Sequence, residues 1–73
     1  MNYWNYRIFK DERGSFSIRE IYYIDDVPQL YSDEPSSPFG GSIDDLKINI
    51  EYMLNCLQKP ILKRSDFERN RMP

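Results

Sequence analysis

Apolar residues in the second half of the chain recur at alternating steps of three and four positions. The series begins at Ile43 and ends at Leu57, with Leu46, Ile50 and Met53 between them. This spacing draws one apolar stripe along an α-helix. We therefore predict an amphipathic helix over residues 43–58, with this stripe facing a sheet.

Both ends of this helix carry the expected signals. Ser42 is a favourable N-cap, and the helix dipole favours the negative charges of Asp44 and Asp45 in the first turn. Pro60 ends the helix, because the residue before a proline is pushed out of the α region. The segment 34–41 holds two prolines and two glycines and is predicted to be a loop.

The residues before this loop predict strands. Residues 2–10 alternate with period two, and residues 15–25 and 29–33 continue the aromatic and β-branched pattern. The turns at 11–14 and 25–28 are too short for crossover connections, so the three strands form an antiparallel meander. In the second strand the apolar set changes face near Arg19 and Glu20, which indicates either a β-bulge or a strand covered on both sides.

These elements define the predicted fold class. It is α+β, a three-stranded antiparallel β-meander packed by one C-terminal amphipathic α-helix (βββα). Residues 1–62 form a single domain, and residues 63–73 form a basic, flexible tail. Whether Ile61 and Leu62 add a fourth strand stays open.

The composition argues against catalysis. The chain has no histidine and one cysteine, Cys56, so it lacks the base of a nucleophilic triad and the ligands of a typical zinc site. Its paired carboxylates fall in predicted turns or at the helix start, where acidic residues are expected for structural reasons. We expect no enzymatic activity, no catalytic residue, no metal and no cofactor, and no small-molecule substrate.

The N-terminus lacks the basic start and apolar run of a signal peptide, and no apolar stretch approaches the roughly 20 residues that span a bilayer. A cytoplasmic location without a membrane partner is the expectation.

The first two strands carry large apolar groups on both faces, which is more than one helix can cover. Because Tyr and Trp are favoured at interface hot spots, we predict a homodimer, or a complex with a protein partner, through an aromatic sheet face. The candidate interaction surface consists of Tyr3, Trp4, Tyr6, Tyr22, Tyr23 and Tyr31. A single-stranded nucleic-acid binder is a weaker alternative, because bases stack on aromatic side chains but the body of the chain is acidic.

Several segments resemble a widespread set of short, uncharacterised bacterial proteins. They are WNYRIF, SIREIYYIDD, SDEPSSPFGGSIDDLKINIEYML and KPIL, which together cover about residues 4–62. That resemblance implies a fold and no activity. The chain is more distantly similar to the N-terminal domain of HicB-type antitoxins, although its loop SSPFGGS departs from their pattern. That similarity implies an inhibitory partner that covers a toxin, which is a further alternative.

Overall fold

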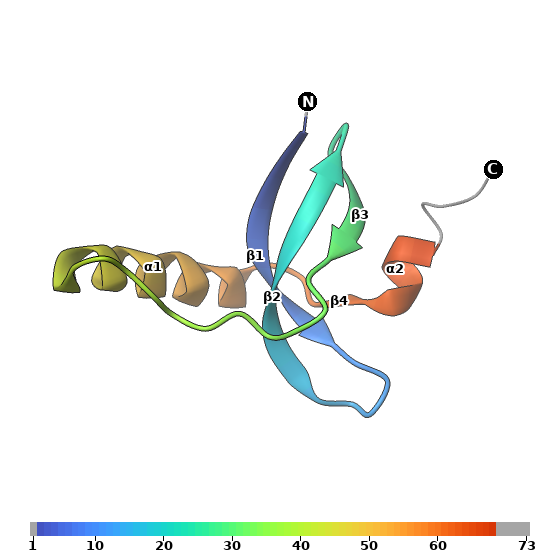
Figure 1. Cartoon of the computed structure of the whole chain (residues 1–73). Helices are drawn as coiled ribbons and strands as arrows, with labels where there is room; N and C mark the ends of the chain where they lie inside the picture. The colour runs from blue at the N-terminus through green and yellow to red at the C-terminus, as the bar shows by residue number, and fades with distance from the viewer. Residues whose placement is uncertain (1, 69–73) are drawn as a thin grey trace.

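The computed structural model of the chain describes residues 2–68 and contains strands and helices in an α+β arrangement (Figure 1). The predicted class is therefore confirmed at that level. The elements follow in the order β1 (Asn2–Lys10), β2 (Phe16–Ile24), β3 (Val27–Tyr31), α1 (Ile43–Asn55), the 3-10 helix η1 (Cys56–Gln58), β4 (Leu62–Lys63) and α2 (Arg64–Glu68).

The sheet has four strands in the order β3-β2-β1-β4. The strands β1, β2 and β3 form the antiparallel meander that the sequence predicts. The short strand β4 is added in parallel at the far edge, where Leu62 pairs with Phe9 and Lys63 with Lys10. The question of a fourth strand is thereby answered, and the sheet is mixed rather than purely antiparallel.

Two short turns fix the register of the meander. In the first, the Asp11 carboxylate accepts hydrogen bonds from the backbone N–H groups of Arg13 and Ser15, while Gly14 takes a positive φ of 84°. In the second, Asp25 and Asp26 both have positive φ, at 51° and 66°. Two consecutive left-handed residues are typical of the tight turns whose twist matches that of the flanking strands.

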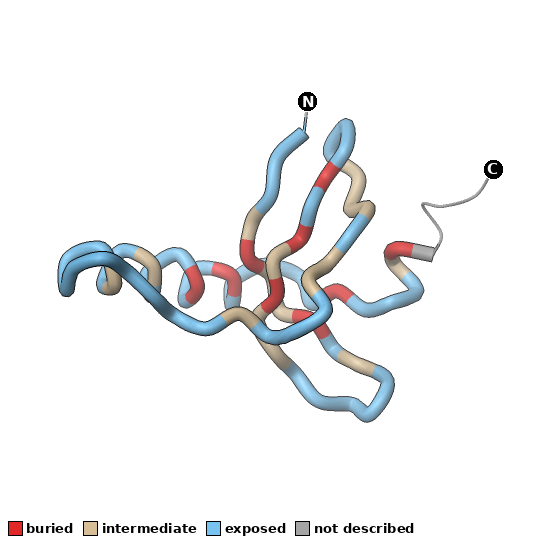
Figure 2. The backbone as a smooth tube through the Cα atoms, viewed as in Figure 1, coloured by how far each residue is buried: buried red, intermediate tan, exposed pale blue. Residues whose placement is uncertain are grey.

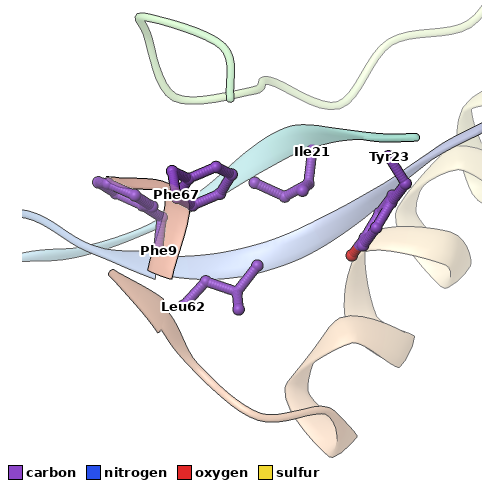
Figure 3. Close-up of a cluster of buried hydrophobic side chains, with 5 residues drawn as sticks. All are labelled: Phe9, Ile21, Tyr23, Leu62 and Phe67. Atoms are coloured by element: carbon purple, nitrogen blue, oxygen red, sulfur yellow. The ribbon is translucent and has the colours of Figure 1, made fainter. Parts of the chain in front are cut away.

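One face of the sheet is covered by the C-terminal segment. Phe67 of α2 is 1% exposed and lies against the side chains of β1, β2 and β4 (Figure 3). The packed chain therefore extends to Glu68 instead of ending at residue 62, because Phe67 completes this core. The remainder of the predicted tail, residues 69–73, lies outside the described residues. The members of this cluster are Phe9, Ile21, Tyr23, Leu62 and Phe67.

The other face carries a second cluster. Tyr6 of β1 packs with Met53 and Cys56 from the C-terminal end of α1 and η1, and Ile8 and Ile18 border them. The apolar residues of β2 change face because the sheet is covered on both sides. The irregularity in pairing lies elsewhere, between Tyr22 and Tyr23 opposite β3.

The helix α1 does not lie along the sheet, and this part of the prediction is wrong. Met53 is the one buried residue of α1, all of whose residues are described, and Ile43 at the opposite end is 80% exposed. Figure 1 shows α1 leaving the sheet at its C-terminal end and extending away from it, and Figure 2 shows buried positions only toward that end.

The loop between β3 and α1 explains this direction. Its early part is fixed to the sheet, because Ser36 N donates to Ile18 O at 2.8 Å. Its later part follows α1, where Phe39 N donates to Asn49 Oδ1 at 3.1 Å. Gly40 lies so close to the helix that a Cβ on it would be 2.3 Å from Leu46 N. The loop therefore packs on the N-terminal half of α1, away from the sheet.

Candidate interaction surface

The six aromatic residues predicted as one surface are divided between the two sides of the sheet. Side chains of successive strand residues point to opposite faces. Trp4, Tyr6 and Tyr22 therefore share the face that α1 touches, and Tyr3, Tyr23 and Tyr31 share the face that α2 covers. Within these sets the structure leaves Tyr3, Trp4 and Tyr22 exposed, and Tyr6 and Tyr23 are buried.

On the face that α1 touches, Tyr6 has a structural role. Its hydroxyl accepts a hydrogen bond from Asn49 Nδ2 at 3.1 Å, and its ring meets Trp4 edge to face at 5.2 Å. Trp4 is half exposed beside it. Further along this face, the Tyr22 hydroxyl donates to Glu20 Oε1, and this hydrogen bond raises the pKa of Tyr22. Trp4 and Tyr22 are cross-strand partners and remain the accessible part of the prediction.

On the opposite face, the three tyrosines pack against the core. Tyr3 stacks on Tyr23 with ring centres 4.6 Å apart, and Tyr31 stacks on Phe9 at 4.3 Å. The Tyr23 hydroxyl accepts a hydrogen bond from Arg7 Nη1. Two effects raise the pKa of Tyr3. The larger is desolvation of its hydroxyl, and the next is a hydrogen bond to Asp26. On this face Tyr23 therefore belongs to the core, and Tyr3 and Tyr31 pack at its edge.

The largest run of exposed apolar side chains lies on the helix instead. Leu54 and Leu57 are each 62% exposed, and Ile50 is 45% exposed. The three-and-four spacing identifies Ile50 and Leu57 as members of one apolar stripe, but the prediction that this stripe faces the sheet is wrong for both. We call the following four residues the α1 stripe: Ile43, Ile50, Leu54 and Leu57.

A groove runs along another side of α1, between the helix, the loop and β1. It is open, has a volume of about 830 Å³ and is lined by apolar and polar groups. Trp4 contributes from β1, Phe39 from the loop, and Ile48 and Tyr52 from α1. Helical geometry places Ile48 and Tyr52 on the side of α1 away from Ile50 and Leu54. The helix therefore presents apolar groups on two sides.

A second groove, at the opposite end of the molecule, has a basic lining. Arg13, Lys63 and Arg64 lie around it, together with Lys10 and the buried Arg19. Arg64 forms an ion pair with Glu12. Arg19 donates through Nη1 to the carbonyl oxygens of Ser32 and Asp33, so it holds the start of the loop on β2. Each of these two arginines therefore has a structural partner.

The side chains that could carry chemistry lie in the core, in the first turn of the meander and at the start of α1. Cys56 is 2% exposed, and burial raises the pKa of its thiol more than Arg7 and Lys59 lower it. Within residues 2–68, no group of three or more His, Cys, Asp or Glu side chains is placed to hold a metal ion. Asp11 caps its own turn, and Asp44 and Asp45 lie in the first turn of α1.

Comparisons with known proteins add no assignment. No family model matches the chain. Neither the search of curated proteins nor the search of solved structures found a match. Among the described residues, no helix combines the length and the apolar character needed to cross a membrane.

Proposed function

We propose that this protein is a non-enzymatic interaction module that self-associates through the α1 stripe. The observation that carries this proposal is the exposure of Ile43, Ile50 and Leu54 on α1, which leaves the body of its own chain, and of Leu57 on η1 directly after it. Contiguous exposed apolar groups on a small protein mark interaction surfaces. The aromatic pair Trp4 and Tyr22 on the sheet would border the contact rather than form its centre.

The stability of α1 supports the same conclusion. The helix has 13 residues, and isolated helices of about this length are marginal in water unless tertiary packing supports them. Within the chain, α1 is supported by Met53 and Asn49 near the sheet and by the loop along its N-terminal half. A partner on the exposed side would supply the packing that an amphipathic helix normally has.

The free energy gained by burying the α1 stripe is large enough to drive association. Full burial of a Leu or Ile side chain contributes about 1.5–3 kcal/mol. Covering the α1 stripe in two copies involves eight such side chains, each partly buried already. The gain is comparable with the cost of association, which is of the order of 4–15 kcal/mol.

The remaining alternatives stay predictions. An inhibitory partner of the HicB type would also use an exposed apolar surface. A nucleic-acid binder would stack bases on exposed aromatic side chains of the sheet, such as Trp4 and Tyr22. A cytoplasmic location remains part of the proposal.

Thermal unfolding at several protein concentrations tests self-association through α1. The unfolding midpoint of a dimer rises with concentration, whereas that of a monomer does not. We expect a rise for the unmodified chain and none for the double variant Ile50→Gln/Leu54→Gln. The matched control is Glu51→Gln/Asn55→Gln, which changes two exposed polar residues on another side of the same helix and should keep the rise. A midpoint independent of concentration in the unmodified chain would contradict the proposal.

A further inference from the structure

We propose that the outer edge of β1, at residues 2–6, binds an extended acidic peptide segment of a partner protein, which adds to the sheet as a further strand. This surface is separate from the α1 stripe, so the inference goes beyond the proposed self-association. Its support comes from the direction of the backbone groups in β1, from the lack of protection along this edge, and from the groove beside it.

The backbone groups of Trp4 and Tyr6 point away from β2. In the turn that joins β1 and β2, Asp11 N donates to Ser15 O at 2.9 Å, and the register continues from there along β1 without a shift. Hydrogen-bonded and non-hydrogen-bonded pairs alternate in an antiparallel ladder, so the odd-numbered residues of β1 bond to β2 and the even-numbered ones face outward. On the outer side, β4 pairs with the last two residues of β1 only. Among the described residues, none bonds to the backbone N–H or C=O groups of Trp4 and Tyr6, so these groups are available to a further strand.

The two edges of the sheet differ in their protection. Exposed strand edges attract other chains, and proteins guard them with prolines, charged side chains or bulges. The β3 edge has Pro28 and an irregularity in its pairing with β2. Residues 2–6 of β1, with the sequence NYWNY, have no proline, no charged side chain and a regular register. The β1 edge is therefore open to strand addition.

The groove along α1 reaches this edge. Three consecutive residues of β1, namely Trp4, Asn5 and Tyr6, contribute to its lining, although neighbouring side chains of a strand point to opposite faces. The groove therefore meets β1 at its edge. Its volume of about 830 Å³ is within the range of roughly 300–1,000 Å³ that is typical of ligand pockets, which suits a segment of a few residues. Because α1 extends outward from the sheet beside β1 (Figure 1), a single extended chain fits this edge better than the sheet of a second copy.

The charges at this end of the groove favour an acidic segment. Lys59 lines the groove and forms no ion pair within the described part of the chain. Arg7 is held next to it, and its guanidinium group donates only to uncharged oxygens, those of Pro60 and Tyr23. The carboxylate in the lining, that of Asp45, lies 14 positions before Lys59, or about 20 Å along the helix. An acidic side chain beside Lys59 therefore gains attraction from two cations and meets little repulsion.

Exposed aromatic rings offer the segment side-chain contacts as well. Trp4 and Tyr52 are both exposed, and both line the groove. In strand addition, main-chain hydrogen bonds supply the affinity, and contacts with alternate side chains supply the specificity. We therefore expect apolar residues next to the acidic one in the bound segment.

Selection from a displayed library of random eight-residue peptides tests the proposal on the unmodified protein. Each enriched peptide is synthesised with N-methyl groups on its odd amides or on its even amides, and its binding is measured by fluorescence anisotropy. A strand that pairs along one edge uses alternate amides only. One methylated form should therefore bind at least about tenfold more weakly, while the other should bind about as well as the parent peptide.

Variants of the protein locate the site. Trp4→Pro removes the outward N–H of residue 4 and Trp4→Ala keeps it, so the proline variant should bind the peptides about tenfold more weakly than the alanine variant. Lys59→Glu should weaken the binding of acidic peptides severalfold, and Lys47→Glu, the same change on another side of α1, should not. The methylated peptides are measured on the unmodified protein, so a Trp4→Pro chain that fails to fold leaves the test intact.

Three results would overturn the inference. The first is a library that yields no binding peptide. The second is an equal effect of methylation on odd and even amides, which shows that the peptide does not pair as a strand. The third is binding that Ile50→Gln/Leu54→Gln abolishes and Trp4→Pro preserves, which places the peptide on the α1 stripe.

Discussion

Asn49 of α1 and Tyr6 of β1 are joined by a hydrogen bond of 3.1 Å between the Asn49 amide nitrogen and the Tyr6 hydroxyl, across 43 positions of sequence. The Asn49 carboxamide oxygen accepts a second hydrogen bond from Phe39 N. One side chain therefore connects the sheet, the helix and the loop, and sets the angle at which α1 leaves the body. The Asn49 amide group thus determines where the α1 stripe is presented.

Replacement of Asn49 by alanine should destabilise the protein by about 1–3 kcal/mol, because two hydrogen bonds are lost and the partly buried Tyr6 hydroxyl is left without its donor. Urea unfolding measures this change. Asn55→Ala, on an exposed position of the same helix, is the control and should change the free energy of unfolding by less than about 0.5 kcal/mol. Equal effects from the two variants would argue against the linking role of Asn49.

Gly40 and Gly41 offer a matched comparison in the loop. A Cβ at position 40 would lie 2.3 Å from Leu46 N and 2.7 Å from the backbone carbon of Asp45, whereas one at position 41 would meet only the Asp45 carboxylate at 3.8 Å. Gly40→Ala should therefore destabilise by about 1–3 kcal/mol through this overlap. Gly41→Ala should be close to neutral in the same unfolding experiment. A neutral Gly40→Ala would mean that the loop does not approach α1 as the structure has it.

Phe67 tests whether the packed domain extends past residue 62. Its side chain is 1% exposed in the cluster with Phe9 and Leu62. Phe67→Ala should cost about 3–5 kcal/mol, as truncation of a buried aromatic ring does. Ile61→Ala, at a 53% exposed residue nearby, should cost much less. If residues 64–68 were part of a flexible tail, Phe67→Ala would leave the unfolding midpoint unchanged.

The Cys56 thiol should react slowly in the folded protein. Burial raises its pKa, so the folded state holds less thiolate than the unfolded state in the pH range near the usual thiol pKa. The sign for stability follows, because the unfolded chain ionises first and folding stability falls as pH rises past the unfolded pKa. Reaction with an aromatic disulfide reagent, with and without denaturant, measures the difference. Equal rates in both states would contradict the burial of Cys56.

The sequence predicted most local structure correctly, for physical reasons. Alternation and short turns define β1 and β2 because side-chain direction in a strand has period two. Ser42 and the spacing after it define α1 because capping and amphipathicity are also local. The Ser42 hydroxyl indeed accepts from Asp45 N.

The remaining features depend on contacts between distant residues. A periodic stripe indicates that one side of a helix is covered, but it does not indicate by what, so the prediction that Ile50 and Leu57 face the sheet is wrong. The pairing of Leu62 with Phe9 adds to β1 a strand of two residues, Leu62–Lys63, that carries no local strand signal. Phe67 stands alone among polar residues, and its burial follows from the position of α2. The aromatic residues predicted as one surface lie on both faces of the sheet, because neighbouring strand residues point to opposite faces and both faces are covered.

The mass of the unmodified protein in solution tests self-association through α1 most directly. Sedimentation equilibrium at concentrations from low to high micromolar should give a mass that approaches twice the 8.8 kDa of one chain, and the Ile50→Gln/Leu54→Gln variant should remain at the mass of one chain. A mass of one chain for the unmodified protein at every concentration would contradict the proposal, as would a dimer that these two substitutions leave intact.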